Sequence, residues 1–190
     1  RAQNIEDAIH TYEQSLQVRT RETMPIEWAQ SINNLAAAYR KRIRGDRAQN
    51  IEDAIHNYKQ SLQVINREAS PIYWAQSTSN LANAYRERIR GDRAQNIEDA
   101  IHACEQSLQV ITREAMPIEW AQSMNNLANT YYLRIHGDRA QNIEDAIHAC
   151  EQSLHIRTRE AMPIEWAQSM NDLANTYYLR IHGDRAQNIE

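Results

Sequence analysis

The chain has 190 residues, a formal net charge of −4 and a pI near 6, so it lacks the overall positive field typical of nucleic-acid-binding proteins. No apolar run approaches the roughly 18–20 residues that a membrane-spanning helix needs. We therefore expect neither a nucleic-acid partner nor a membrane association.

A six-residue motif, RAQNIE, recurs every 46 residues and both opens and closes the sequence. A fixed period of this size predicts an array of repeated structural units. We expect one repeat domain over residues 1–190, and we expect the chain to be a piece of a longer array. The predicted units are 1–46, 47–92, 93–138 and 139–184, followed by a stub at 185–190.

Each period predicts two helices, and residues 117–162 illustrate both in chain order. Pro117 suits a first helical position, where the backbone N–H would have no partner in any case. Apolar side chains follow at helical spacing as far as Ile135. Gly137 can then take the left-handed conformation that ends a helix. The same opening proline occurs in the other units as Pro25, Pro71 and Pro163.

The second helix of the period begins near Asp138, whose side chain can accept a hydrogen bond from the helix start. Gln141 follows three residues later, as in a capping box. Asn142 followed by Asp145 is an overlapping cap candidate, so the start of this helix stays open within a turn. No alternating strand pattern competes with the helical periodicity. We predict an all-α fold of antiparallel helix pairs.

The two cysteines, Cys104 and Cys150, occupy equivalent positions one period apart. Stacked helix axes lie about 8–10 Å apart, farther than the roughly 7 Å between Cα atoms that a disulfide allows. Tyr12 and Tyr58 fill the same position in the other units, which indicates core packing. Reduced thiols favour an intracellular, cytoplasmic location.

The pattern NNLA-x-x-Y at residues 125–131, with the small residues of the following helix, resembles the tetratricopeptide repeat. The preceding P-x-x-x-A makes it especially similar to the longer repeats of kinesin light chain and of bacterial multi-repeat proteins. The period exceeds the family's usual length of about 34 residues, which leaves the superhelical pitch open. The matching positions are Met124, Leu127, Ala128 and Tyr131 in the first helix and Ala146, Cys150 and Ser153 in the second.

This resemblance implies a right-handed superhelical solenoid whose first helices line a concave groove for peptides or protein segments. It also implies a scaffold rather than an enzyme. The histidines recur once per period, and identical positions one unit apart do not converge as metal ligands must. We therefore expect no catalytic residue, no metal site and no cofactor.

Amide side chains dominate the groove side of the first helices once their apolar stripe is set aside. A carboxamide both donates and accepts hydrogen bonds, which suits the backbone of an extended peptide. An alternative for the Asn34, Asn80 and Asn126 row is a bond to the neighbouring helix that propagates the stack. The predicted peptide-binding residues are, unit by unit, Gln30, Asn33, Asn34 and Arg40; Gln76, Asn80, Asn83 and Arg86; Gln122, Asn125, Asn126, Asn129 and Tyr132; and Gln168, Asn171, Asp172, Asn175 and Tyr178.

Two positions of this ladder vary along the chain. Arg40 and Arg86 in the first two units give way to Tyr132 and Tyr178 in the last two, and one asparagine row ends in Asp172. We hypothesise a groove that is cationic near the N-terminus and aromatic or acidic toward the other end. A partner with an acidic portion and an apolar anchor would fit it.

Two other functions stay open from the sequence. Near-identical units with exposed apolar ends can stack, which predicts a structural array that self-associates through its solenoid ends. Long repeats of this type in bacteria also resemble those fused to caspase-like CHAT peptidase or nucleotide-binding domains. That resemblance predicts a regulatory arm of a larger multidomain protein.

Overall fold

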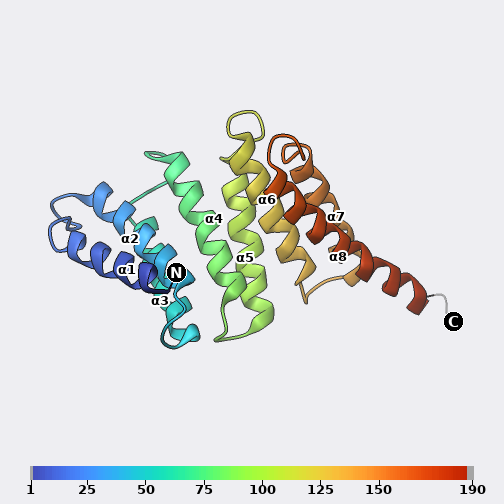
Figure 1. The fold of residues 1–190 in the computed structure, drawn as a ribbon, viewed down its shortest axis with the longest axis horizontal. Helices are drawn as coiled ribbons and strands as arrows, with labels where there is room; N and C mark the ends of the chain where they lie inside the picture. The colour runs from blue at the N-terminus through green and yellow to red at the C-terminus, as the bar shows by residue number, and fades with distance from the viewer. Residues whose placement is uncertain (1, 188–190) are drawn as a thin grey trace. The chain divides into compact units, whose positions relative to one another are not determined.

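The computed structural model describes residues 2–187, with side chains described for residues 2–180. Across these residues the chain forms helices and no strand, which confirms the all-α prediction (Figure 1). Helices that open on a proline alternate with helices that carry the repeated motif. The eight described helices are α1 (Ala2–Leu16), α2 (Pro25–Lys41), α3 (Arg47–Leu62), α4 (Pro71–Glu87), α5 (Arg93–Leu108), α6 (Pro117–Tyr132), α7 (Arg139–Leu154) and α8 (Pro163–Gln187).

The chain divides into two compact units, each larger than one 46-residue repeat, with the boundary inside α5. From here on, the first unit means residues 1–103 and the second unit means residues 104–190. In the first unit α2 packs against α1, α3 and α4, and α3 also packs against α4. In the second unit α6 packs against α7 and α8, and α7 also packs against α8. The antiparallel pairs α2–α3 and α6–α7 are therefore the same building block, two periods apart (Figure 1). That all four repeats form one domain stays a prediction.

Helix α7 starts where the aspartate cap predicts. The Asp138 carboxylate accepts a hydrogen bond from the backbone N–H of Gln141 at 2.8 Å. A capping box also needs the Gln141 side chain to bond back to the backbone of Asp138. That part of the prediction is wrong, because the Gln141 side chain donates instead to Asp145, one turn further along α7. Asn142 is not the cap either. It is 2% exposed and donates to the carbonyl oxygen of His136, so it holds the turn between α6 and α7.

The glycine of that turn has the predicted left-handed conformation, with φ of +79° at Gly137. Helix α6 has already ended at Tyr132, so the glycine shapes the connection rather than the helix terminus. A Cβ there would make only an ordinary contact with Asn142, so the need for glycine is conformational. In the fourth 46-residue repeat, α8 continues to Gln187, so the helix end that the repeat predicts near Gly183 is wrong. The residue equivalent to the turn-holding asparagine is Asn188, which lies outside the described residues, as does the end of the predicted stub.

Small side chains bring the two helices of a pair into close contact. The Ser61 hydroxyl donates to the carbonyl oxygen of Ala29 at 2.8 Å, and Ser153 donates to that of Ala121 at the same distance. Both serines are fully buried, so each bond ties a motif-bearing helix to the start of its proline-opened partner. This bond, which spans 32 residues, joins the proline-opened helix of one 46-residue unit to the motif-bearing helix that begins the next unit.

The cysteine position belongs to the core, as predicted. Cys104 and Cys150 are each 1% exposed and are thiols rather than disulfide halves. The equivalent Tyr58 is 0% exposed. Burial raises the pKa of the Cys150 thiol to about 12, because removal from water disfavours the thiolate. Both thiols therefore belong to the packed core.

Arginine–glutamate pairs fix the end of a proline-opened helix onto the motif-bearing helix before it. In the first unit Arg88 donates through Nε and Nη2 to the two carboxylate oxygens of Glu52, at 2.8 and 2.9 Å. The same pairing joins Arg42 to Glu6. The bond from Arg88 lowers the pKa of the Glu52 carboxyl, and that from Arg42 lowers the pKa of the Glu6 carboxyl.

Within the described residues, no helix combines the length and apolar character needed to cross a membrane.

Candidate peptide-binding surface

The predicted peptide-binding residues all lie on the proline-opened helices α2, α4, α6 and α8, but their exposure differs widely. Asn125 and Asn126 are only 4% and 8% exposed, so the ladder is not one continuous open surface. The exposed members are Asn34, Gln122, Gln168, Asn171, Asn175 and Tyr178. The half-buried members are Gln30, Asn33, Arg40, Gln76, Asn80, Asn83, Arg86, Asn129, Tyr132 and Asp172.

In the first unit, part of the ladder surrounds a hollow of about 240 Å³ between α2 and α4. Its floor is Ile65, which follows α3 and is 2% exposed, and Tyr73 at the start of α4 forms an apolar wall. Four of the predicted residues and Ser77 supply the rest of the lining: Gln30, Asn33, Asn34 and Gln76. The hollow is smaller than the roughly 300–1,000 Å³ of a typical small-molecule site, and suits a single side chain.

Asn33 gives this hollow an unused hydrogen-bond acceptor. Its Oδ1 is buried and has no hydrogen-bond partner. A buried acceptor left without a partner costs about 1–3 kcal/mol. Rotating the Asn33 amide toward a bound peptide N–H would recover that free energy, because the carboxamide can present either of its faces.

The equivalent place in the second unit is occupied by Arg157, two periods after Ile65. Its guanidinium donates to the hydroxyl of Ser169 at 3.0 Å and to Oε1 of Gln122. Those two residues correspond to Ser77 and Gln30 of the first unit, so the arginine bridges the two walls of the corresponding site. Arg157 is 3% exposed and its Nε has no hydrogen-bond partner. Burial lowers the pKa of the Arg157 guanidinium, because a charge is costly away from water.

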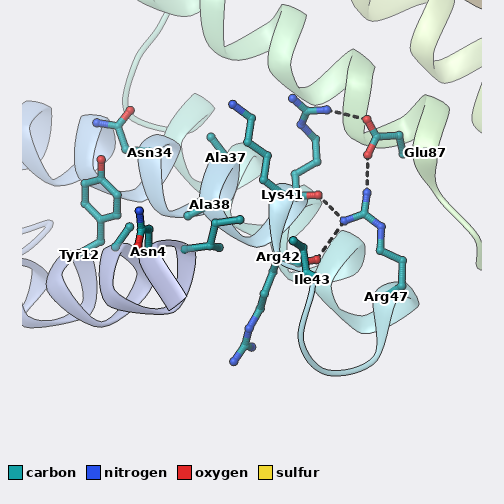
Figure 2. Close-up of a pocket in the computed structure, with 13 residues that line it drawn as sticks. Asn4, Tyr12, Asn34, Ala37, Ala38, Lys41, Arg42, Ile43, Arg47 and Glu87 are labelled. Carbon is teal, nitrogen blue, oxygen red and sulfur yellow. Dashed lines mark hydrogen bonds and ion pairs between the residues drawn. The ribbon is translucent and has the colours of Figure 1, made fainter. Parts of the chain in front are cut away.

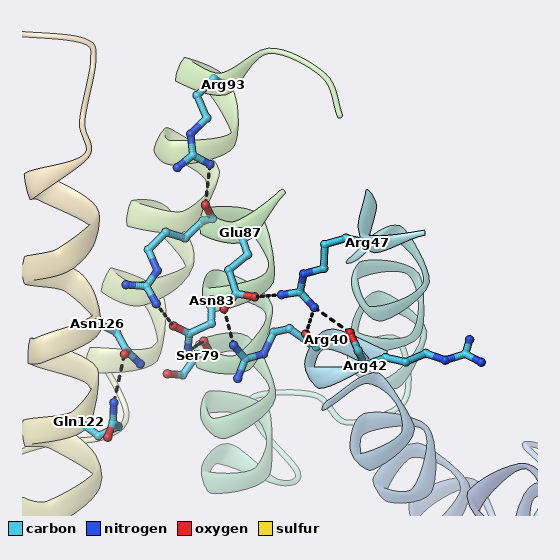
Figure 3. A network of polar contacts seen from close by, with 10 residues as sticks. Arg40, Arg42, Arg47, Ser79, Asn83, Glu87, Arg93, Gln122 and Asn126 are labelled. Carbon is cyan, nitrogen blue, oxygen red and sulfur yellow. Dashed lines mark hydrogen bonds and ion pairs between the residues drawn. The ribbon is translucent and has the colours of Figure 1, made fainter. Parts of the chain in front are cut away.

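Asp172 binds the amides of the second unit together. Its Oδ2 accepts from the side-chain amides of Asn125 at 3.0 Å and Asn129 at 3.1 Å, both on α6. Its Oδ1 accepts from Gln168, one turn earlier on α8, at 3.0 Å. The stack-propagating bond that was the alternative for this asparagine row is therefore made by Asp172, while Asn126 accepts from Gln122 on its own helix (Figure 3).

A second, larger hollow of the first unit, about 990 Å³, lies along α1 and α2 (Figure 2). It includes the predicted residues Asn34 and Arg40, but its base is apolar: Ile5 and Ala8 come from α1, and Ala38 from α2. The residue equivalent to Ala8 in the next repeat, Ala54, is fully buried. The larger hollow therefore has the character of a helix-packing face.

Arg40 does not offer an unpaired cation to this surface. Its Nη1 lies 2.6 Å from one carboxylate oxygen of Glu87 on α4, and Nη2 of Arg47 lies 2.7 Å from the other (Figure 3). Arg86 donates to Oδ1 of Asn83 at 3.2 Å. The predicted cationic end of the groove is thus balanced at Arg40 by a carboxylate from the neighbouring repeat.

The aromatic side chains at the equivalent position in the second unit differ from one another. Tyr132 is half-buried beneath Arg139, whose guanidinium carbon lies 6.0 Å from the ring centroid. Tyr178 is 62% exposed. Sequence reasoning assigned both residues to one binding role, but only Tyr178 presents most of its ring to solvent.

The residues that distinguish the two sites, Ile65 and Arg157, lie in loops and were missed by a search confined to helix faces. A signal was available, because Ile111 and Arg157 are one of only four differences between the third and fourth units. The contacts of Arg157 are hard to predict from the sequence because its side chain is long. It starts in the loop after α7 and reaches both α6 and α8.

No group of three or more His, Cys, Asp or Glu side chains in the described part of the chain could hold a metal ion. The histidines His10 and His56 each bond a glutamine one turn along their own helix.

Comparison with known proteins places three of these helix pairs in one family. A family model for the tetratricopeptide repeat matches residues 28–68, 74–113 and 120–160, together more than half of the chain. Each match begins at the tryptophan in the first turn of α2, α4 or α6 and ends beyond the following helix. A search of curated proteins found no match.

Proposed function

Because the chain belongs to the tetratricopeptide repeat family, we propose that it is an interaction scaffold that binds an extended peptide segment along α2 and α4. Repeats of this family generally mediate protein–protein interaction or scaffolding and are typically not catalytic. The proposal assigns no cofactor and no metal, and the ligand is a peptide that inserts one apolar or aromatic side chain into the first unit.

The observation that carries this proposal is the 240 Å³ hollow between α2 and α4. Ile65 and Tyr73 offer apolar surface to an inserted side chain, and burial of apolar area contributes roughly 25 cal/mol per Å². The surrounding amides offer donors and acceptors to the peptide backbone on either side. Asn33 adds an acceptor that has no partner within the chain.

The second unit supports no equivalent insertion, because Arg157 already spans the corresponding walls. Its amide donors are also engaged, since the side-chain N–H groups of Asn125 and Asn129 both donate to Asp172, although Oδ1 of Asn125, like that of Asn33, is buried without a partner. We therefore assign the binding role to Gln30, Asn33, Asn34 and Gln76. For the buried pair Asn125 and Asn126 we assign a packing role.

An acidic portion in the partner, expected from the sequence, would have to compete with Glu87 for Arg40. We therefore leave it out of the ligand's description. A cytoplasmic location remains part of the proposal, supported by two buried cysteines that form no disulfide. The kinesin-light-chain subtype and a role as the regulatory arm of a multidomain protein stay predictions.

The experiment is selection of peptides from a random library on the immobilised chain, followed by calorimetric titration. Selected peptides should share one apolar or aromatic residue flanked by positions of any sequence. Replacing Asn33 by leucine should weaken binding roughly tenfold, the loss of about one or two hydrogen bonds. The matched control is Asn171→Leu, which changes the same row on exposed α8 and should leave affinity unchanged. Equal loss from both variants, or no selected peptide, would contradict the proposal.

A further inference from the structure

One carboxylate joins three helices of the first unit, at the far ends of the two helices that line the 240 Å³ hollow. Glu87 ends α4, and its Oε1 lies 2.6 Å from Nη1 of Arg40, near the end of α2. Its Oε2 lies 2.7 Å from Nη2 of Arg47, which begins α3 (Figure 3). Arg47 also donates through Nη1 to the carbonyl oxygens of Arg40 and Arg42, which holds the end of α2. We call Arg40, Arg47 and Glu87 the clamp.

The clamp is partly withdrawn from water, so its charges depend on one another. The side chains of Arg40 and Glu87 are 19% and 28% exposed. Nε of Arg40 is buried and has no hydrogen-bond partner, so Glu87 is the group that compensates this cation. Removing one partner of a poorly hydrated ion pair leaves the other charge uncompensated. Without the Glu87 charge, two arginines would face each other across the junction, and like charges repel.

The second unit uses other chemistry at the equivalent junction of α6, α7 and α8. Leu179 of α8 stands where α4 has Glu87, and it packs against the apolar core of its unit. Tyr132 of α6 stands where α2 has Arg40, and the guanidinium carbon of Arg139 lies 6.0 Å from its ring centroid. The chain therefore holds the same junction in two ways, by paired charges in the first unit and by apolar and aromatic contact in the second.

The clamp and the hollow share two helices. Asn33 lines the hollow, and Arg40 lies roughly 10 Å further along α2, from the rise per residue of an α-helix. On α4, Gln76 lines the hollow and Glu87 ends the helix. Helices transmit displacements as rigid elements. A change in the spacing of α2 and α4 at the clamp therefore also changes the spacing of the walls of the hollow.

We propose that Glu87 is a positioning residue for the peptide site and that the clamp makes peptide affinity depend on ionic strength. This inference rests on the proposed function, because it concerns the hollow between α2 and α4. The residues that line the hollow carry no charge, so a peptide without charges has no direct ionic contact there. Salt weakens binding of such a peptide indirectly, because screening of the clamp loosens the spacing of α2 and α4.

The test is calorimetric titration with a selected peptide that has no charged residue and blocked ends. Sodium chloride is raised from about 0.1 M to about 1 M, over which the screening length falls from about 10 Å to about 3 Å. The affinity of the original chain should fall roughly threefold, the scale of a partly exposed ion pair. Glu87→Gln keeps the size of the side chain and removes its charge, so affinity at low salt should fall roughly tenfold.

A rescue variant and a matched control accompany this titration. Arg40→Tyr combined with Glu87→Leu installs the residues of the second unit, and should restore affinity and abolish its salt dependence. Glu6→Gln removes an ion pair of 2.7 Å with Arg42, just after α2, that joins α2 to α1 rather than to α4. This control should leave both affinity and salt dependence unchanged. Circular dichroism establishes that each variant is folded.

A measurement without peptide separates this inference from the proposed function. In the ¹⁵N-labelled Glu87→Gln variant, the side-chain amide signals of Asn33 and Gln76 should shift, and that of Asn125 should not. Unshifted signals, or salt-independent binding by the original chain, would overturn the role of the clamp while leaving peptide binding intact. Salt dependence that persists in the rescue variant would also overturn it, because its origin would lie outside the clamp. No peptide binding by the original chain at any salt concentration would overturn both proposals.

Discussion

Replacing Ile65 by arginine should abolish peptide binding while leaving the chain folded. The arginine has a ready-made environment, because the equivalent Arg157 bonds Ser169 and Gln122, and the first unit has Ser77 and Gln30 in their places. Arg19, at the same repeat position, also donates to a serine, Ser31, at 3.2 Å. The new side chain should therefore bridge α2 and α4 and fill the hollow. We expect affinity for a selected peptide to fall roughly 30-fold or more.

Calorimetry with the selected peptide measures this loss, and thermal denaturation followed by circular dichroism verifies the fold. The charge control is Ile72→Arg, which adds an arginine beside Tyr73 at a position already 48% exposed. The size control is Ile65→Val, which keeps the floor apolar. Both controls should bind like the original chain. Undiminished binding by a folded Ile65→Arg variant would show that the ligand enters elsewhere.

The converse change, Arg157→Ile, should stabilise the second unit without creating a second peptide site, because Glu165 stands where the first unit has Tyr73, and Asn125 and Asn129 stay bonded to Asp172. Arg157 is 3% exposed, and its Nε has no partner, so a charge is held out of water with incomplete compensation. Replacing a buried charge by a well-packed apolar side chain commonly stabilises a protein, and here we expect about 1–3 kcal/mol in the free energy of unfolding. Isoleucine fits this repeat position, since Ile65 and Ile111 occupy it at 2% and 1% exposure.

Chemical denaturation measures the stability, and calorimetric stoichiometry measures the number of peptides bound per chain. The denaturation midpoint should rise, and the number of peptides bound per chain should stay at one. Arg19→Ile is the matched control, because it makes the same change at the same repeat position on an exposed side chain. It should change neither quantity. A lower midpoint for Arg157→Ile would mean that the bonds to Ser169 and Gln122 outweigh the cost of burial.

The helix pairs could be predicted from the sequence because their determinants are local. A proline at the first position, an aspartate cap such as Asp138 and an apolar stripe act within a few residues of themselves. One wrong prediction concerns a side chain whose partner lies outside its own helix. The role of Asn142 was misjudged because its partner, the carbonyl of His136, lies across the turn rather than in the helix it was expected to cap.

The candidate site could be predicted only in outline. Helical spacing indicated which face carries the amides, but it does not reveal which amides are already satisfied. Asn125 is withdrawn from the surface by Asp172 on another helix, and that bond depends on a single Asn-to-Asp difference between the third and fourth units. Near-identical repeats therefore differ in their hydrogen bonds where one long or charged side chain changes the partners of its neighbours, as Arg157 does.

We propose that the amides of the first unit contact the ligand, while the amide donors of Asn125 and Asn129 in the second unit are engaged within the chain. Nuclear magnetic resonance of the ¹⁵N-labelled chain tests it directly, through the side-chain amide signals of Asn and Gln during titration with a selected peptide. The largest shifts should belong to Gln30, Asn33 and Gln76, with Asn125 and Asn126 unmoved. Shifts centred on those two buried asparagines, or spread evenly over all four repeats, would contradict the assignment.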